Sequence, residues 1–93
     1  IFGVLKSYLV SYDLKPPGKS DRELIVAIEK FSLSWHHLDS TWIVKTDWSA
    51  RQVRDHLKPH LESTDELLVV ELSGEGAWAG FNDEAVNWLS EHL

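Results

Sequence analysis

The chain has 93 residues, of which 43% are hydrophobic and 26% charged, and this composition indicates one globular domain over residues 1–93. It contains no cysteine, which excludes thiol catalysis, thiolate metal sites and disulfides and makes the cytoplasm the expected compartment. Nine Lys and Arg residues against fifteen Asp and Glu residues give a net charge of −6, which opposes non-specific binding to a phosphate backbone.

The hydrophobic residues are too dispersed along the chain for a membrane span. No apolar run approaches the roughly 18 to 20 residues that cross a bilayer, and the opening apolar stretch is too short for the core of a signal peptide. We therefore expect a soluble protein with no membrane partner. Because the chain starts with Ile1 and not with Met, we expect it to be trimmed or to begin inside a longer gene product.

Residues 4–14 predict the first strand. They are dense in β-branched, aromatic and leucine residues, and Tyr8, Val10 and Tyr12 alternate with polar positions at the spacing of a half-buried strand. The Lys15-Pro16-Pro17-Gly18 segment that follows predicts a turn, because proline removes a backbone donor and glycine adopts turn conformations freely.

A helix is predicted after this turn. Ser20 and Glu23 have the spacing of a capping box, in which two side chains satisfy free backbone amides at the start of a helix. Leu24, Ile28 and Phe31 then recur on one helical face, so the helix should pack on the sheet and end at about Phe31.

Two short apolar stretches between residues 35 and 46 flank Asp39 and Ser40. This pattern is typical of either a β-hairpin or one long bent strand. The polar pair at its centre favours the hairpin.

The second half of the chain predicts a helix, a strand and a last helix. Ser49 and Gln52 form a second capping box, and Pro59 should interrupt the short helix that follows. Residues 65–72 predict a strand, which the glycines after it should end. Asn82 can cap a last amphipathic helix, whose apolar residues are Ala85, Val86, Leu89 and Leu93.

This order of elements predicts an α+β fold of ferredoxin-like type: a βαββαβ sandwich in which a four-stranded antiparallel sheet carries two helices on one face, plus a C-terminal helix. In the last strand we expect Leu68, Val70 and Leu72 to face the helices. The other face of the sheet would then carry, from the first and last strands, Leu9, Ser11, Asp13, Leu67, Val69 and Glu71. Either a second subunit or the terminal helix should cover this half-apolar face.

Three segments of the chain resemble a known family: Tyr12-Asp13-Leu14, Leu38-Asp39-Ser40-Thr41-Trp42 and Asp65-Glu66-Leu67-Leu68-Val69. In order and spacing they resemble the SinR-like family and, more distantly, the Cas-two family, which is the small second core subunit of CRISPR adaptation. The SinR-like resemblance extends from about Leu5 to Leu93. Its most distinctive stretch is residues 35–42.

The resemblance implies a ferredoxin-like homodimer in which the carboxylate that ends the first strand, here Asp13, faces its twin. In the Cas-two family such a pair is proposed to hold a divalent cation for phosphodiester hydrolysis, and the dimer bridges integrase subunits. For this chain it implies a Mg- or Mn-dependent endonuclease with Asp13 as metal ligand and catalytic residue. We expect contacts to nucleic acid or to an integrase partner at Tyr12, Lys15, Arg22 and Ser40.

The chain departs from this nuclease-like pattern in three respects. It is acidic, its first helix begins with a single basic residue, Arg22, and it ends in a predicted helix where the family has an exchanged strand. Each departure weakens the prediction of nucleic-acid binding.

Asp13 and His37 are the candidate catalytic residues. A carboxylate suits Mg²⁺ or Mn²⁺, but an Asp at the end of a strand also commonly bonds to backbone groups of the next turn. His37 is the candidate general acid or base near the Asp13 face, with a structural or exposed role as its alternative. Because His36 and His37 are adjacent on a strand, they point to opposite faces and cannot form one metal site.

Other residues also admit two interpretations. Ser40 lacks the strained turn and the paired base of a nucleophile, which favours a turn role. The tryptophans and tyrosines can stack on bases, but a small domain needs them in its core and in dimer contacts. The basic residues form either a binding strip or scattered solvated charges: Lys15, Lys19, Arg22, Lys45, Arg51, Arg54 and Lys58.

The sequence leads to one main functional hypothesis, one alternative and a third possibility. The hypothesis is a Cas-two-like or SinR-like homodimer, with a metal-dependent nuclease site around paired Asp13 residues or a role as a nucleic-acid-processing accessory protein. The alternative is a non-catalytic homo-oligomeric assembly module that binds another protein. A third and weaker possibility, a small-ligand or regulatory domain, would require a buried polar pocket.

Overall fold

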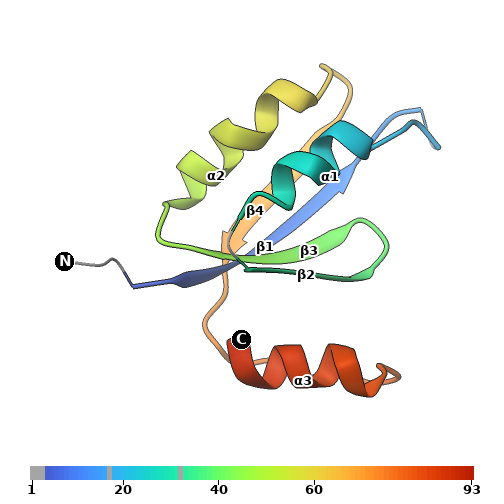
Figure 1. Cartoon of the computed structure of the whole chain (residues 1–93). Coiled ribbons are helices and arrows are strands. Elements are labelled where there is room, and N and C mark those ends of the chain that lie inside the picture. Colours follow the sequence, from blue (N-terminus) through green and yellow to red (C-terminus); the bar gives the residue numbers. More distant parts are fainter. Residues whose placement is uncertain (1–3, 17, 32) are drawn as a thin grey trace.

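A computed structural model describes residues 4–16, 18–31 and 33–93 of the chain. Pro17, part of the predicted proline turn, lies outside the described residues. Within the described part of the chain, no helix has the length and apolar character that crossing a membrane requires. The elements follow one another as in Figure 1: β1 (Lys6–Asp13), α1 (Arg22–Ile28), β2 (Leu33–Leu38), β3 (Thr41–Thr46), α2 (Ala50–Leu57), the 3-10 turn η1 (Lys58–His60), β4 (Glu66–Glu71) and α3 (Asp83–His92).

The described strands form one antiparallel sheet in the order β2-β3-β1-β4. β1 lies inside it and pairs with β3 on one side and with β4 on the other. β2 joins the outer side of β3 through a turn at Asp39 and Ser40, which confirms the predicted hairpin. The α+β class is confirmed as well, and the strand order is compatible with a ferredoxin-like arrangement.

The main core lies between the sheet and the helices α1 and α2 (Figure 1). Tyr8, Val10 and Tyr12 of β1 are buried there, as the alternation of β1 predicts. Both tyrosine hydroxyls have partners, since Tyr8 donates to the carbonyl of Trp48 at 2.7 Å and Tyr12 to the carboxylate of Asp21 at 2.6 Å. These bonds avoid the cost of burying an unpaired hydroxyl, about 1–3 kcal/mol.

The prediction for the two faces of β4 is wrong. Leu67 and Val69 pack against the core under α1 and α2, whereas Leu68 and Val70 lie on the other face and are exposed. The register decides this, because Leu67 is opposite Tyr12, and directly opposed residues of neighbouring strands point to the same face. By the same rule Glu71, opposite Tyr8, belongs to the helix-bearing side.

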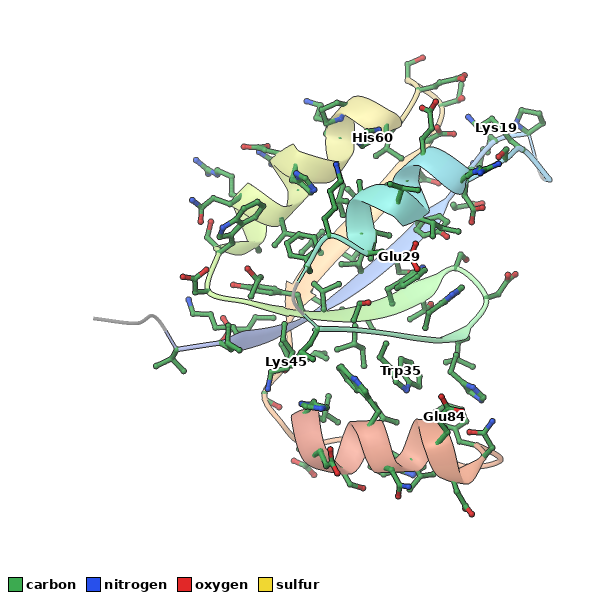
Figure 2. The ribbon with its side chains drawn as sticks, viewed as in Figure 1. Lys19, Glu29, Trp35, Lys45, His60 and Glu84 are labelled. Atoms are coloured by element: carbon green, nitrogen blue, oxygen red, sulfur yellow. The ribbon has the colours of Figure 1, made fainter. Side chains whose placement is uncertain are left out.

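The helix α3 covers part of the face opposite α1 and α2, which we call the open face. Ala85 and Leu89 of α3 are buried against Trp35 of β2 and Ile43 of β3 in a second, smaller core. Leu72, predicted to face α1 and α2, packs against this second core. Figures 1 and 2 place α3 on the opposite side of the sheet from α1 and α2, with Trp35 pointing toward it.

Polar and close apolar contacts hold α3 on the open face. The hydroxyl of Ser7 in β1 donates to the carbonyl of His92 at 3.1 Å. Gly76, in the connection that leads to α3, lies so near Leu93 that a Cβ atom there would come within 2.7 Å of its Cδ2. Of the two covers predicted for the open face, the terminal helix is therefore present. It leaves Leu68 and Val70 exposed.

The caps of α2 and α3 form as predicted. Ser49 Oγ accepts a hydrogen bond from the Gln52 amide at 3.2 Å, and Gln52 Oε1 accepts one from the Ser49 amide at 2.8 Å. Asn82 Oδ1 accepts from the Ala85 amide at 2.9 Å. Each cap satisfies backbone donors that have no partner inside the helix.

The capping box predicted for α1 does not form. The N-cap residue is Asp21, and its carboxylate accepts the Tyr12 hydroxyl in place of a helix amide. Ser20 Oγ accepts only a long bond of 3.4 Å from the Arg22 amide. The helix also ends at Ile28, before the predicted end at residue 31. The helix thus begins without a side-chain cap.

The two serines allow a direct comparison. We expect Ser49→Ala to lower the free energy of unfolding by about 1 kcal/mol, because the variant loses a formed cap. We expect Ser20→Ala to change it by less than about 0.5 kcal/mol, since that serine caps no helix. Urea unfolding followed by tryptophan fluorescence measures both values. Equal losses in the two variants would contradict the difference between the caps.

Candidate functional site

Asp13, the leading candidate, lies exposed at the end of β1, directly opposite Glu66 at the start of β4. Lys15 Nζ lies 3.5 Å from Glu66 Oε1, and both side chains are largely exposed, so this pair contributes little to stability. Its positive charge offsets part of the repulsion between the two opposed carboxylates. A shallow hollow of about 310 Å³ lies at this point, lined by Ser11, Tyr12, Asp13, Glu66, Leu67 and Leu68.

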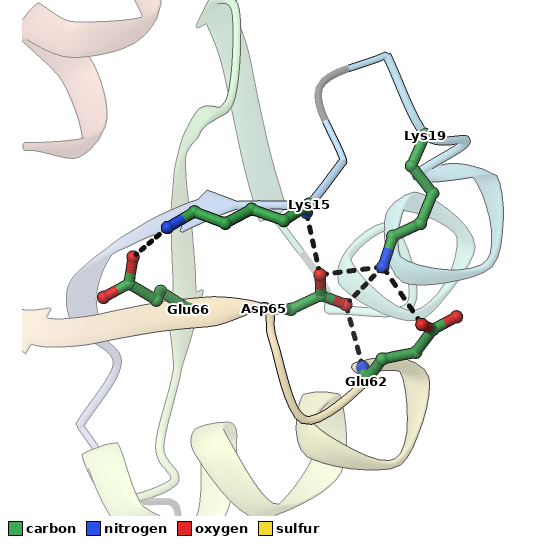
Figure 3. A network of polar contacts seen from close by, with 5 residues as sticks. All are labelled: Lys15, Lys19, Glu62, Asp65 and Glu66. Atoms are coloured by element: carbon green, nitrogen blue, oxygen red, sulfur yellow. Dashed lines mark hydrogen bonds and ion pairs between the residues drawn. The ribbon is translucent and has the colours of Figure 1, made fainter.

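A network of polar contacts centred on Asp65 adjoins this hollow (Figure 3). Asp65 Oδ1 accepts from the Lys15 amide at 3.0 Å and from Lys19 Nζ at 2.7 Å. Asp65 Oδ2 accepts from Lys19 Nζ at 2.9 Å and from the Glu62 amide at 2.8 Å. The side chain of Asp65 is only 1% exposed. The network therefore ties the loop between β1 and α1 to the turn that precedes β4.

The contacts in this network shift two pKa values. The bond from Lys19, followed by the amides of Glu62 and Lys15, lowers the pKa of Asp65 from its ordinary 3.8 to about 2. The bond to Asp65 raises the pKa of Lys19 above its ordinary 10.5. Both groups are therefore charged at neutral pH. Because each Asp65 oxygen already accepts two hydrogen bonds, we assign Asp65 a structural role and not a ligand-binding one.

Tyr12, a predicted contact for nucleic acid or a partner, is a core residue. It is 6% exposed, so its ring offers no face for stacking on a base. Burial, and then the hydrogen bond to Asp21, raise the pKa of Tyr12 to about 12. The hydroxyl therefore stays protonated as a donor at neutral pH.

The other predicted contact residues lie around the same end of the sheet. Arg22 is exposed at the start of α1 and lines a hollow of about 350 Å³ together with Lys19 and Asp21. Ser40 lies in the β2–β3 turn, and its carbonyl accepts the Tyr12 amide at 3.3 Å. This backbone contact fits the turn role that the sequence favours for Ser40.

His37 lies apart from Asp13. It is exposed on β2 and packs its ring against Phe81 at a centroid distance of 4.7 Å and near Trp35 at 5.9 Å. β3 lies between β2 and β1, so His37 is two strands across the sheet from Asp13. His36 stacks on Trp42 on the opposite side of the strand, as the prediction of opposed faces requires.

The residues around Asp13 do not fit a metal site within one copy of the chain. Among the described residues, no group of three or more His, Asp or Glu side chains is placed to hold an ion. Asp13 and Glu66 form a pair, and Asp65 is saturated by Lys19 and backbone amides. A Mg²⁺ or Mn²⁺ ion takes about six oxygen ligands and keeps some as water, so this pair would need ligands from elsewhere.

Sequence reasoning missed the network of Asp65 and Lys19. These two residues are 46 positions apart in the sequence, and no local sequence pattern indicates that they are in contact. One signal was available, since Asp65 stands three residues after Glu62, a spacing at which an Asp side chain closes a turn by accepting a backbone amide.

Comparisons with protein-family models, curated proteins and solved structures find no match for this chain. The resemblance to the SinR-like and Cas-two families therefore remains a prediction.

Acid titration tests the Asp65 network. Asp65→Asn should lower the free energy of unfolding at neutral pH, because it removes the charge that Lys19 and the two amides stabilise. A carboxylate whose folded pKa of about 2 lies below its ordinary 3.8 stabilises the fold above pH 3.8, and this contribution disappears as the pH falls through about 2. The stability difference between wild type and variant should shrink across that window.

Urea unfolding at a series of acidic pH values provides the measurement. Glu66→Gln is the matched control, because it removes one carboxylate from an exposed ion pair with Lys15. We expect this control to show a much smaller difference at neutral pH. A difference for Asp65→Asn that stays constant across the window would rule out the charged network as its cause.

Proposed function

We propose that the protein is a non-catalytic assembly module that pairs with a second copy of itself through the open face of its sheet. One observation carries this proposal. Leu68 and Val70 form an apolar strip on β4 that α3 leaves uncovered, with 54% and 39% of their surface exposed. Contiguous apolar side chains on an uncovered sheet face are typical of interaction surfaces.

The strip continues into an apolar groove. Val70 is opposite Leu9 of β1, and Leu9 lines a groove of about 380 Å³ beneath α3 and the connection that precedes it. Leu38 and Trp78 also line this groove and are 48% and 36% exposed. The open face thus combines a hollow with exposed apolar side chains.

This combination suits pairing of two identical copies. A two-fold interface uses the same patch on both subunits, so the patch must complement itself. Exposed apolar side chains of one copy can occupy the groove of the other. A stable interface takes about 800 Å² from each partner, roughly an eighth of the 6386 Å² surface of this domain.

The net charge of −6 predicts how salt should act on the pair. Two acidic copies repel each other at long range, and salt screens that repulsion. Self-association should therefore strengthen as ionic strength rises. Binding to a nucleic acid would show the opposite dependence, because it releases counterions.

Substitution of Leu68 tests the interface. The wild-type protein should have a mass of twice 10.7 kDa by size-exclusion chromatography with light scattering. Leu68→Lys should return it to the monomer mass, because a charge would enter the centre of the apolar strip.

Val26→Lys is the matched control. Val26 is 49% exposed, close to the value for Leu68, but it lies on α1, on the other side of the sheet. We expect this variant to remain dimeric. A monomeric wild type at high salt, or equal dissociation of both variants, would reject the open face as the interface.

A metal-dependent nuclease is the second candidate function. It is favoured by the position of Asp13 and Glu66, which are opposed at the end of the sheet beside the apolar strip. A pair of copies that brings these ends together would gather four carboxylates, which is enough oxygen donors for Mg²⁺ or Mn²⁺. On this candidate, metal binding depends on the dimer.

Manganese binding tests this candidate separately. If it is correct, the wild type should deplete free Mn²⁺ in an electron paramagnetic resonance titration, and Asp13→Asn should abolish that uptake while leaving the mass unchanged. Asp55→Asn is the control, because this exposed carboxylate on α2 pairs with Arg54 and lies outside the site. Uptake that is identical in wild type and Asp13→Asn would eliminate the nuclease candidate.

A further inference from the structure

The outer side of β4 is an unpaired edge of the sheet. β4 stands last in the strand order and pairs with β1, and no strand in the described residues occupies its other side. The strand is poorly buried along its length. Its outward backbone amides and carbonyls are therefore available to an added strand, which is a common way for a sheet to bind an extended peptide.

The side chains of β4 differ between its two faces. On the open face Leu68 and Val70 are exposed and lie beside the edge. On the other face Leu67 and Val69 are half-buried against the helix core. A strand added to β4 would therefore gain most by placing large apolar side chains on the open face, next to Leu68 and Val70.

Two glutamates bracket this apolar centre. Glu66 and Glu71 are the first and last residues of β4, and both are exposed. Lys15 approaches Glu66 in an exposed pair at 3.5 Å, whereas no ion pair to Glu71 occurs among the described residues. The edge thus presents apolar side chains between two negative ends.

This charge pattern disfavours pairing of β4 with a second β4. When two such strands align antiparallel over their full length, Glu66 of each faces Glu71 of the other. If one strand is shifted by one residue, Glu71 faces either Asp65, which is a second like-charge pair, or Leu67, which sets a charge against an apolar side chain. Like charges directly opposed in a sheet are destabilising. The edge therefore favours an occupant with a different sequence.

We propose that the β4 edge binds an extended strand of a different protein, in which two Lys or Arg residues flank a short apolar segment. In an antiparallel pairing, the two basic residues stand five positions apart, opposite Glu71 and Glu66. Apolar residues at the second and fourth positions lie beside Val70 and Leu68. This inference goes beyond the proposed self-association, because it uses the outward backbone groups of β4, whereas the self-association uses the side chains of the open face.

A fluorescein-labelled peptide with the central sequence KVTITK follows this pattern, and EVTITE is its charge-reversed form. Fluorescence anisotropy should show KVTITK binding to the wild type about tenfold more tightly than EVTITE, from two opposed charge pairs. The double variant Glu66→Lys with Glu71→Lys should reverse this preference. Hydrogen exchange should slow at the outward β4 amides when KVTITK is present.

Glu23→Lys with Glu29→Lys is the control for net charge. It changes the charge by the same amount at exposed positions at the two ends of α1, away from the β4 edge, and should keep the wild-type preference. Reversal in this control, slowed exchange outside β4, or no anisotropy change at millimolar peptide would overturn the proposal. Light scattering of the same samples reports the dimer independently, so failure of either proposal is seen separately.

Discussion

The fold depends on the pairing of β1 with β3 on one side and β4 on the other. Because β1 lies inside the sheet, the alternation of its side chains assigns a face to every residue opposite them. Tyr8, Val10 and Tyr12 thereby define the layer under α1 and α2, and Leu9 defines the face that α3 covers in part. The hydroxyl of each buried tyrosine has a hydrogen-bond partner, so neither tyrosine adds an unpaired donor to the core.

The same pairing concentrates charge and apolar surface at one margin of the sheet. Asp13 of β1 lies opposite Glu66 of β4, so the pairing brings two carboxylates together. The Asp65 network holds the loop between β1 and α1 beside them. A short step along β4, Leu68 and Val70 are uncovered. The proposed binding of polypeptide rests on this exposed leucine and valine between glutamates, and the net charge of −6 opposes binding to a phosphate backbone.

The sequence predicted most of the local structure. Period-two alternation identified β1, the polar pair at Asp39 and Ser40 identified the hairpin, and Ser49 with Gln52 marked the start of α2. It failed at the start of α1, where Ser20 and Glu23 form no capping box and the carboxylate of Asp21 accepts the Tyr12 hydroxyl. For the candidate site it named Asp13 and Lys15, which lie at one end of the sheet, and His37, which the structure places two strands away on β2.

The sequence by itself determined the α+β class, the order of the elements and the lack of thiol chemistry, because hydrophobic period, capping residues and composition are local or global properties of the chain. Only the tertiary structure decided which face of β4 is exposed. A strand that is apolar on both faces fits either orientation until its register with β1 selects one. The contact of Asp65 with Lys19 was decided in the same way, since residues 46 positions apart meet only after the sheet has brought their loops together.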